Sequence, residues 1–211
     1  MRLTSPVFTI HQTVNEPNIM TVAGIILAAG SASRMKQPKL LLPWKGEPLI
    51  RHAVNVALDC LDPVIVITGA WKKEVLGALT DLPIKNVHNH EWMNGQSTSI
   101  RAGINALHYD VDAVFFLLGD QPYVSTILLQ GMVEKYYQTH PSILAPYVGD
   151  KRSNPVLFDH SIFNELCQIE GDIGARAIFK HHQITTYAWH DKKLLLDIDT
   201  PEDYQKITSE S

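Results

Sequence analysis

Short, mostly apolar runs recur along the chain, separated by longer segments of mixed polarity. The runs have the length of strands and occupy residues 22–28, 64–68, 84–88, 111–118, 143–147 and 155–158. Runs of this kind are typical of strands buried on both faces of a sheet. Apolar side chains at helical spacing predict a helix over residues 48–58, and further helices are expected over residues 72–79 and 99–107. Because strand, helix and strand follow with short connections, we expect an α/β fold with right-handed crossovers and a mostly parallel sheet.

The first twenty residues stand apart from this pattern. They lack the basic start and apolar core of a signal peptide, and Asn15, Pro17 and Asn18 are typical of a linker. The first buried run begins almost immediately after Met20. We therefore expect residues 1–20 to be a dispensable extension and residues 21–211 to form one domain.

Composition limits the classes of ligand. The chain has 211 residues, of which 45% are hydrophobic, and 18 basic and 22 acidic residues give a net charge of −4. This charge provides no broad attraction to nucleic acid or to an anionic membrane, and no apolar run is long enough for a membrane helix. Phosphate binding must then depend on a few placed groups, which favours a small phosphorylated ligand. Cys60 and Cys167 form no Cys-x-x-Cys pair and are interpreted as reduced thiols of a cytoplasmic protein.

A turn of small residues follows the first buried run. Gly30, Ser31 and Ser33 allow the backbone to bend sharply and approach an anion, and Arg34 and Lys39 add two cations nearby. The spacing fits neither a P-loop nor a dinucleotide fingerprint. The residues by themselves leave two alternatives, a triphosphate cradle or an ordinary strand-to-helix turn with surface cations.

This stretch resembles the Leu-Ala-Ala-Gly-x-Ser-x-Arg-Met-Gly-x-x-Lys loop of the nucleotidyltransferases. The matching residues are Leu27, Ala28, Ala29, Gly30, Ser31, Ser33, Arg34, Met35 and Lys39. The resemblance implies that the loop binds nucleotide and that Arg34 and Lys39 are catalytic, together with Asp120 further along the chain. Lys36 stands where the family usually has glycine, which predicts either a different local turn or a third cation beside the phosphates.

Two later segments are further candidates for nucleotide binding. Thr68 and Gly69 end the second strand, where they could line a base pocket or simply form a tight turn. The polar segment around Trp92 resembles an Asn-x-x-Trp-x-x-Gly-x-x-x-Ser motif that helps to enclose the nucleotide in cytidylyltransferases. Without that resemblance the segment is a capped helix start. The candidates in it are Asn94, Gly95, Ser97, Ser99 and Arg101.

Two aspartates are candidate metal ligands. Asp120 follows the most apolar strand, within a Leu-Leu-Gly-Asp-Gln-Pro segment that resembles the second motif of the same family. A carboxylate at such a strand end can hold a hard divalent cation beside phosphate oxygens, and Ser125 is better placed to cap the following helix. Alternation in residues 194–199 predicts a strand with Asp197 and Asp199 on one face, and Asp199 is the second candidate ligand. Thr200 is expected to cap the final helix.

A third group of residues is predicted to contact the substrate. Residues 149–154 form a polar loop where the family commonly shows Gly-x-x-Gly-His-Pro; this chain keeps the proline and loses a glycine and the histidine. Residues 171–176 resemble the Gly-Asp-x-Gly-Ala-Arg turn of the family. The candidates are Gln121, Arg152, Asn154, Asp172 and Arg176. The ten histidines show no zinc-ligand spacing, and we expect no zinc site.

The resemblance extends from Thr21 to Tyr204 through at least four separated motifs. It is a resemblance to the molybdenum cofactor cytidylyltransferase branch of the glycosyltransferase-A-like nucleotidyltransferases, and the Ala-Ala-Gly form of the first loop favours this branch over the guanylyltransferases. It implies a three-layer α/β/α sandwich that is Rossmann-like. It also implies transfer of CMP from CTP to the terminal phosphate of molybdopterin, with Mg²⁺ on Asp120 and Asp199. A molybdenum hydroxylase apoenzyme, such as that of xanthine dehydrogenase, is an implied partner.

Two alternatives remain open at this stage. A cytidylyl- or uridylyltransferase that acts on a sugar or alcohol phosphate would handle phosphates in the same way. A maturation factor could bind the cofactor and a hydroxylase without catalysis, although such a carrier has no need of Lys39, Asp120 and Asp199. Every hypothesis in which the protein is an enzyme requires that the carboxyl groups of residues 120 and 199 lie close together and that Lys39 points toward them.

Overall fold

The first apolar run forms an interior strand of the sheet in the computed structural model, which describes residues 20–32, 35 and 37–209. This strand, β1 (Thr21–Ala28), pairs in parallel with β4 (Val64–Thr68) on one side and β6 (Val111–Leu118) on the other. Val22 and Ile26 face one hydrophobic core, and Ala23 and Ile25 face a second. A strand covered on both faces has no solvated side, which explains its almost continuous apolar sequence.

The sheet is mostly parallel, as predicted. Its order is β10-β7-β9-β6-β1-β4-β5, and β8 pairs with β7. The other strands are β5 (Lys85–His88), β7 (Ile143–Val148), β8 (Lys151–Arg152), β9 (Val156–Asp159) and β10 (Ile184–Ala188). Only the pairs that involve β8 or β9 are antiparallel within this sheet over the described residues.

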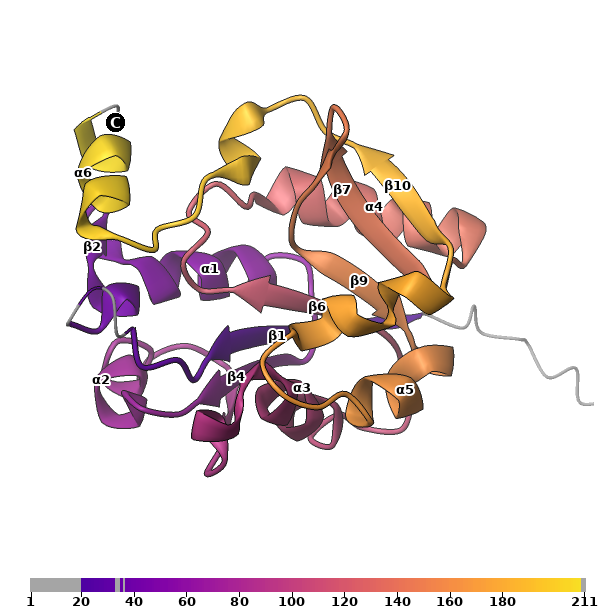
Figure 1. The fold of residues 1–211 in the computed structure, drawn as a ribbon, viewed down its shortest axis with the longest axis horizontal. Helices are drawn as coiled ribbons and strands as arrows, with labels where there is room; N and C mark the ends of the chain where they lie inside the picture. The colour runs from indigo at the N-terminus through magenta and orange to yellow at the C-terminus, as the bar shows by residue number, and fades with distance from the viewer. Residues whose placement is uncertain (1–19, 33–34, 36, 210–211) are drawn as a thin grey trace, which may run out of the picture.

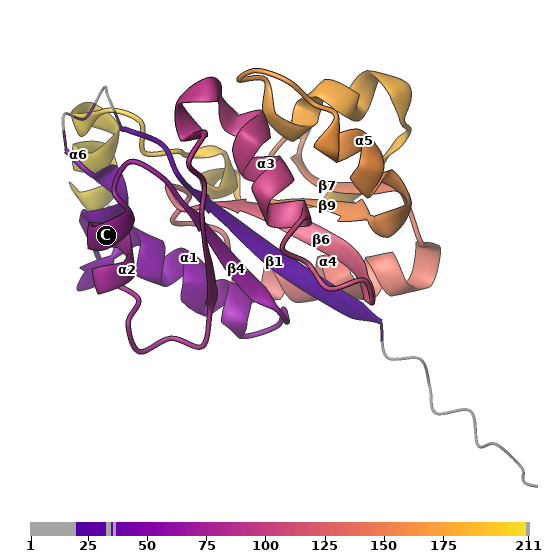
Figure 2. The same cartoon turned by 90° about the horizontal axis from the view of Figure 1, so that it is seen from below.

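Helices cover both faces of the sheet, which confirms the three-layer arrangement (Figures 1 and 2). One face carries α1 (Leu49–Leu58), α2 (Lys72–Gly77) and α4 (Thr126–Thr139), whose buried residues include Val54, Val75 and Leu128. The other face carries α3 (Gln96–Ile104), α5 (Phe163–Cys167) and the 3₁₀ helix η4 (Gly174–His181). The predicted cap of α4 is present, because the Ser125 hydroxyl accepts a hydrogen bond from the Leu128 amide.

The last helix packs beside a small hairpin near the start of the domain. Strands β2 (Pro43–Trp44) and β3 (Glu47–Pro48) form the hairpin, and α6 (Pro201–Ser209) packs against it through a cluster that includes Trp44 and Ile207. The Tyr204 hydroxyl donates to the Pro43 carbonyl at 2.8 Å. This packing brings the segment before α6 next to the segment that contains Lys39.

Sequence predictions about some elements are corrected by the structure. Residues 194–199 form no strand: η5 (Lys192–Leu195) is a 3₁₀ helix and the following residues are irregular. Helix α3 begins at Gln96, three residues earlier than expected, and strand β10 was not predicted. Short 3₁₀ turns also occur at η1 (Lys39–Leu41), η2 (Trp92–Asn94) and η3 (His160–Ile162). Within the described part of the chain, no helix combines the length and apolar character needed to cross a bilayer.

Candidate active site

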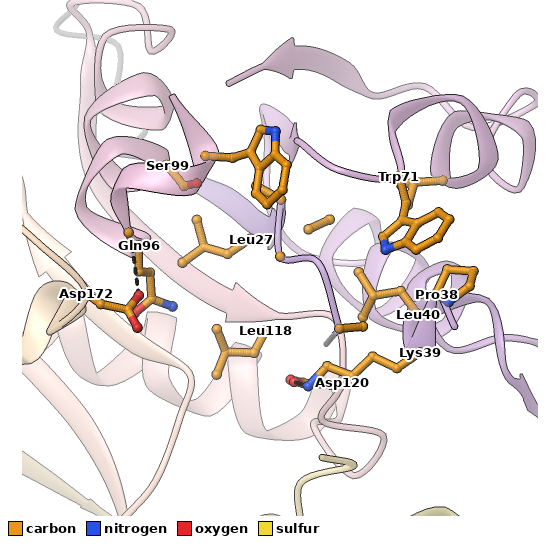
Figure 3. Close-up of a pocket in the computed structure, with 17 residues that line it drawn as sticks. Leu27, Pro38, Lys39, Leu40, Trp71, Gln96, Ser99, Leu118, Asp120 and Asp172 are labelled. Carbon is orange, nitrogen blue, oxygen red and sulfur yellow. Dashed lines mark hydrogen bonds and ion pairs between the residues drawn. The ribbon is translucent and has the colours of Figure 1, made fainter. Parts of the chain in front are cut away.

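The candidate site lies where the carboxyl ends of β1, β4 and β6 meet. The chain passes from β1 to a neighbour on one side, β4, and later returns to the other side as β6, so that a crevice opens above β1. A pocket of about 380 Å³ occupies this position (Figure 3). Its lining includes Leu27, Ala28, Ala29, Gly30, Lys39, Trp71, Trp92, Gly95, Ser99, Asp120 and Asp172.

The small-residue loop after β1 is fastened to the turn after β4. The Ala29 carbonyl accepts from the Ala70 amide at 3.2 Å, and the Ser31 carbonyl accepts from the Trp71 indole N–H at 3.0 Å. Gly69 permits this close approach, because a Cβ there would lie 2.4 Å from the Ala29 carbonyl oxygen. Gly30 faces open space in the pocket, since a Cβ at that position would meet no atom of the described part of the chain within 4 Å. This leaves room for an anion beside the Gly30 backbone.

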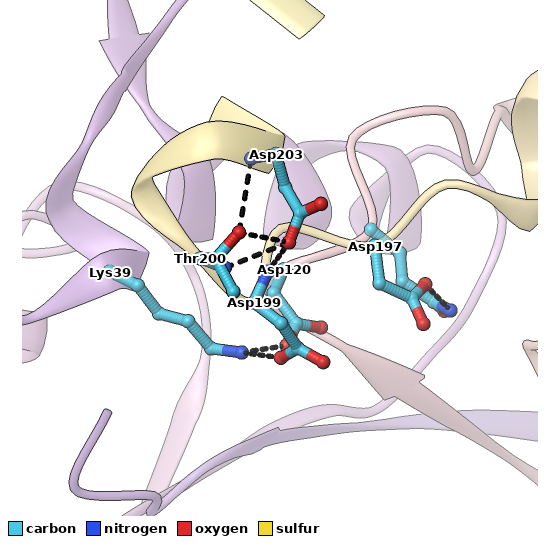
Figure 4. Close-up of polar contacts among 7 residues, drawn as sticks. Lys39, Asp120, Asp197, Asp199, Thr200 and Asp203 are labelled. Carbon is cyan, nitrogen blue, oxygen red and sulfur yellow. Dashed lines mark hydrogen bonds and ion pairs between the residues drawn. The ribbon is translucent and has the colours of Figure 1, made fainter. Parts of the chain in front are cut away.

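Lys39 joins the two predicted metal ligands. Its ammonium nitrogen lies 2.8 Å from Asp199 Oδ1 and also forms an ion pair with Asp120 Oδ2 (Figure 4). Burial by itself would lower the pKa of Lys39, but the Asp120 and Asp199 carboxylates raise it above its usual value. Lys39 therefore stays protonated at neutral pH, and both carboxyl groups reach one cation.

The arrangement of the two aspartates depends on contacts between distant segments. The Ile198 amide donates to the Asp120 carbonyl at 3.1 Å, which ties the segment before α6 to the end of β6. The Asp203 carboxylate accepts from the amides of Asp199 and Thr200 at 3.2 and 2.8 Å, and the Thr200 hydroxyl accepts from the Asp203 amide at 3.1 Å. Thr200 is thus the N-cap that the sequence predicted, and this capping box holds Asp199 at the start of α6.

The donor set fits a divalent cation that is also bound by a nucleotide. Asp120 Oδ1 is buried and has no hydrogen-bond partner among the described residues, so a metal ion could satisfy it. No group of three or more His, Cys, Asp or Glu side chains suited to hold a metal occurs in the described ranges. Mg²⁺ is commonly held by one or two carboxylates together with substrate phosphates and water, which matches the pair Asp120 and Asp199.

Asp197 and Gln121 form a hydrogen-bonded pair near Asp120 and Asp199. The Gln121 side-chain amide donates to Asp197 Oδ1 at 2.6 Å, and Gln121 is only 4% exposed. Burial raises the pKa of Asp197, and the nearby Asp120 and Asp199 carboxylates raise it further. Gln121, predicted to contact substrate, lines neither of the two pockets described here.

A second pocket of about 310 Å³ adjoins the first on the β9 side. Four of the five predicted substrate residues line it, namely Arg152, Asn154, Asp172 and Arg176. The Arg152 guanidinium lies over the Phe179 ring, 4.1 Å from its centroid. The two pockets share Leu27, Gln96, Leu118 and Asp172. Two ligands bound side by side could therefore meet near Leu118 and Asp172.

Residues 24–186 match the family model of the MobA-like NTP transferase domain. The chain belongs to this family, and it is a nucleotidyltransferase. The family predicted from the sequence motifs is thereby confirmed.

Relatives of this nucleotidyltransferase carry several names. It is 32% identical to purine catabolism protein PucB of Bacillus subtilis, over 87% of the chain and 94% of that protein. It is 27% identical to nicotine blue oxidoreductase of Paenarthrobacter nicotinovorans, over 92% of the chain and 100% of that protein. It is 24% identical to molybdenum cofactor cytidylyltransferase of Escherichia coli, over 85% of the chain and 92% of that protein.

A crystal structure of Rv0371c from Mycobacterium tuberculosis has the same fold. It superposes with a TM-score of 0.80 and 25% identity, covering 90% of this chain and 98% of that one. Another structure of Rv0371c, with a TM-score of 0.77 over 91% of this chain and 100% of that one, is described as a complex with manganese at 23% identity.

Several predicted nucleotide contacts of this nucleotidyltransferase lie outside the first pocket. Arg101 points toward α5, where its guanidinium donates to the carbonyls of Cys167 and Ile169 at 3.1 and 3.3 Å. Thr68 is fully buried and accepts a hydrogen bond from the Asn86 amide. The pocket lining also does not include Ser31, Gly69, Asn94 or Ser97. Ser33, Arg34 and Lys36 lie outside the described residues.

The polar segment before α3 is braced from a distant loop. The Gln96 amide donates to Asp172 Oδ1 at 3.1 Å, and the Ser97 amide donates to the Gly171 carbonyl at 3.2 Å. Gly95 has a φ of 101°, and a Cβ there would lie 2.5 Å from the Gly171 oxygen. These contacts cap α3 from a loop that follows it in the chain, which explains why the local serines did not mark its first residue.

Two tryptophans line the pocket. Trp92 belongs to the motif that the resemblance predicted to enclose the nucleotide, although it was not named as a contact, and Trp71 was missed. The signal was available, because each tryptophan lies within a few residues of the carboxyl end of a predicted strand.

Proposed function

We propose that this nucleotidyltransferase transfers CMP from CTP to the terminal phosphate of molybdopterin and releases pyrophosphate. The observation that carries the proposal is the convergence of Asp120 and Asp199 on Lys39, with Lys39 and Asp120 lining the first of two adjoining pockets. The loop Ala28-Ala29-Gly30 and the similarity to the Escherichia coli cytidylyltransferase support CTP as the nucleotide.

The first pocket would hold the nucleotide. The backbone from Ala28 to Ser31, with Lys39 and Arg34, binds the triphosphate, and the β- and γ-phosphates lie against the cations of the loop. Lys39 stabilises the charge that develops on the leaving pyrophosphate, so the residue contributes mainly in the transition state. Phosphoryl chemistry of this kind depends on position and charge neutralisation, and the acceptor phosphate is itself a competent nucleophile.

Asp120 and Asp199 would hold Mg²⁺ or another divalent cation. Such an ion neutralises phosphate charge and orients the reacting groups when it is bound. The unpaired buried oxygen of Asp120 supports this role for the site. The manganese described for Rv0371c belongs to that protein and is consistent with a divalent cation here.

The second pocket would hold the acceptor. Arg152 and Arg176 provide positive charge for the acceptor phosphate, and apolar side chains such as Phe116 and Phe158 line the same space. Asp172 and Asn154 add polar contacts for a ring system. A molybdenum hydroxylase apoenzyme in the cytoplasm is the proposed recipient of the product, and the name of the Bacillus subtilis relative, which refers to purine catabolism, supports a xanthine-oxidising partner.

A nucleotide and acceptor panel tests the proposal. The purified protein is incubated with Mg²⁺ and each of CTP, GTP, UTP and ATP, with molybdopterin or a sugar phosphate as acceptor, and pyrophosphate is measured. We expect release with CTP and molybdopterin, and none with the Asp120→Asn variant. Faster pyrophosphate release with GTP than with CTP would identify the enzyme as a guanylyltransferase. Pyrophosphate release only with a sugar phosphate would identify a different class of acceptor. No release with any pair would favour a cofactor-binding maturation factor.

A further inference from the structure

Two of the four tryptophans of the chain line the first pocket. Trp71 follows β4 and Trp92 follows β5, so the indoles approach the pocket from neighbouring strand ends. The other two lie elsewhere: Trp44 is 2% exposed in the cluster beneath α6, and Trp189 stacks on Tyr187 beside β10. Only part of the Trp71 and Trp92 surface is covered, which leaves ring surface free to contact a ligand.

The indole of Trp71 is held in place by the phosphate loop. Its N–H donates to the Ser31 carbonyl at 3.0 Å, and this bond uses the polar edge of the ring. Figure 3 shows Trp71 beside Pro38 and Leu40, on the side of the pocket away from Asp172. Because the ring is anchored at its edge, its aromatic face can take part in stacking without losing that bond.

The charged groups indicate where the phosphates of a nucleotide would bind. Under the proposed function, the phosphates bind beside Lys39 and Asp120. The rest of the pocket is then left for the base, and Trp71 and Trp92, which follow β4 and β5, line this pocket. Every nucleobase has a π-face, and stacking on an aromatic side chain strengthens binding by roughly ten- to a hundredfold with little dependence on base identity.

We propose that Trp71 and Trp92 bind the nucleobase by stacking, and that this subsite accepts any base. The inference rests on the proposed function, because it assumes that a nucleoside triphosphate occupies the first pocket. In this proposal the two indoles contribute to the affinity for the nucleobase. Discrimination between nucleobases then depends on groups that contact the edge of the nucleobase.

Binding measurements on matched variants test the inference. CTP, GTP and inorganic tripolyphosphate, which has no base, are titrated into the full chain while tryptophan fluorescence and heat are recorded. Trp71→Leu and Trp92→Leu are expected to weaken CTP and GTP about tenfold or more and by similar factors, with tripolyphosphate unchanged. Trp71→Phe keeps an aromatic face without the N–H donor and should retain most of the affinity. Trp189→Leu is the matched control and should behave like the wild type.

Several outcomes would overturn the inference. If Trp71→Leu weakens tripolyphosphate as much as CTP, Trp71 only supports the Ser31 loop and does not bind the base. If both leucine variants bind CTP like the wild type while transfer continues, the subsite assignment fails and the proposed function stands. If the wild type binds no nucleoside triphosphate, the proposed function fails and the inference fails with it. Unchanged melting temperatures of the variants show that losses come from the site.

Discussion

The ammonium nitrogen of Lys39 lies 2.8 Å from Oδ1 of Asp199, a residue 160 positions later in the chain. The same ammonium group pairs with Asp120, 81 positions away. One lysine therefore gathers the two carboxylates that are proposed to hold a divalent cation. Under the proposed function, we expect that the negative charge of an entering triphosphate offers Lys39 an alternative partner and frees carboxylate oxygens for a metal ion.

Replacement of Lys39 by alanine should lower turnover more than nucleotide affinity. In the proposed mechanism the lysine stabilises negative charge that builds on the leaving pyrophosphate, so its loss acts on the transition state. We expect kcat to fall about a hundredfold or more, and the dissociation constant of CTP to rise by less than about tenfold. Steady-state kinetics and calorimetry give the two values, with the exposed Lys45→Ala as control. An unchanged kcat would contradict the assignment.

Removal of the Lys39 charge should strengthen metal binding in the absence of nucleotide. In the wild type the ammonium group occupies carboxylate oxygens and repels a second cation. The Lys39→Met variant is expected to bind Mn²⁺ with a dissociation constant about tenfold lower than that of the wild type. Electron paramagnetic resonance measures the concentration of free Mn²⁺ in the titration. Lys45→Met should show no change. Equal or weaker Mn²⁺ binding by Lys39→Met would show that Asp120 and Asp199 do not form the metal site.

Two glycine variants should separate ligand binding from folding. A methyl group at Gly30 meets no atom of the described residues within 4 Å, so Gly30→Ala should fold normally and obstruct only the anion beside the loop. We expect its affinity for CTP to fall about tenfold. Gly95→Ala combines a φ of 101° with a contact of 2.5 Å to Gly171 and should lose stability, by about 1–3 kcal/mol. Urea unfolding and calorimetry distinguish the two, and a destabilised Gly30→Ala would contradict this assignment.

Loss of the Thr200 hydroxyl should affect both stability and the metal site. Thr200→Ala removes the N-cap of α6 and should cost about 1 kcal/mol of unfolding free energy. Because Asp203 also holds the Asp199 amide, the variant should lower Mn²⁺ affinity as well. Thr200→Ser keeps the hydroxyl and is the matched control. A stability loss without any change in Mn²⁺ binding would show that the cap does not position Asp199.

The stability contribution of Asp197 should depend on pH. Its pKa in the folded protein is raised above the usual 3.8, so the folded state binds its proton more tightly than the unfolded state. The resulting stabilisation is full below pH 3.8 and is lost as pH rises through the folded pKa. The Asp197→Asn variant has no carboxyl group at this position and does not lose stability in this way as pH rises. The unfolding free energy of the variant minus that of the wild type should therefore increase from acidic to neutral pH and then level off.

Urea unfolding in EDTA across this pH range measures the effect, because a bound metal ion would alter the titration of Asp197. The exposed Glu134→Gln is a suitable control for the loss of one carboxylate. A stability difference that stays constant with pH would contradict the raised pKa of Asp197.

The apolar alternation in residues 194–199 predicted a strand that does not exist, because its apolar residues are buried in two different hydrophobic clusters. Leu194 is buried in the cluster on the α1, α2 and α4 face, whereas Ile198 is buried beneath α6 with Trp44. Their spacing imitates a strand although the segment pairs with none. Strand β10 shows the opposite case: it lies at the sheet edge with partly exposed residues, so its sequence lacks the apolar run of β1.

The sequence by itself determined the features that depend on near neighbours and on burial. The apolar runs of β1, β4 and β6 predicted a parallel α/β sheet, Ser125 and Thr200 predicted two caps, and the loop motif predicted the family. Only the tertiary structure decided which distant side chains meet: Lys39 with Asp199, Arg101 with the α5 carbonyls, and Trp71 with the Ser31 loop. The physical reason is that capping and strand burial follow from local spacing, whereas these contacts depend on how the sheet brings its carboxyl ends together.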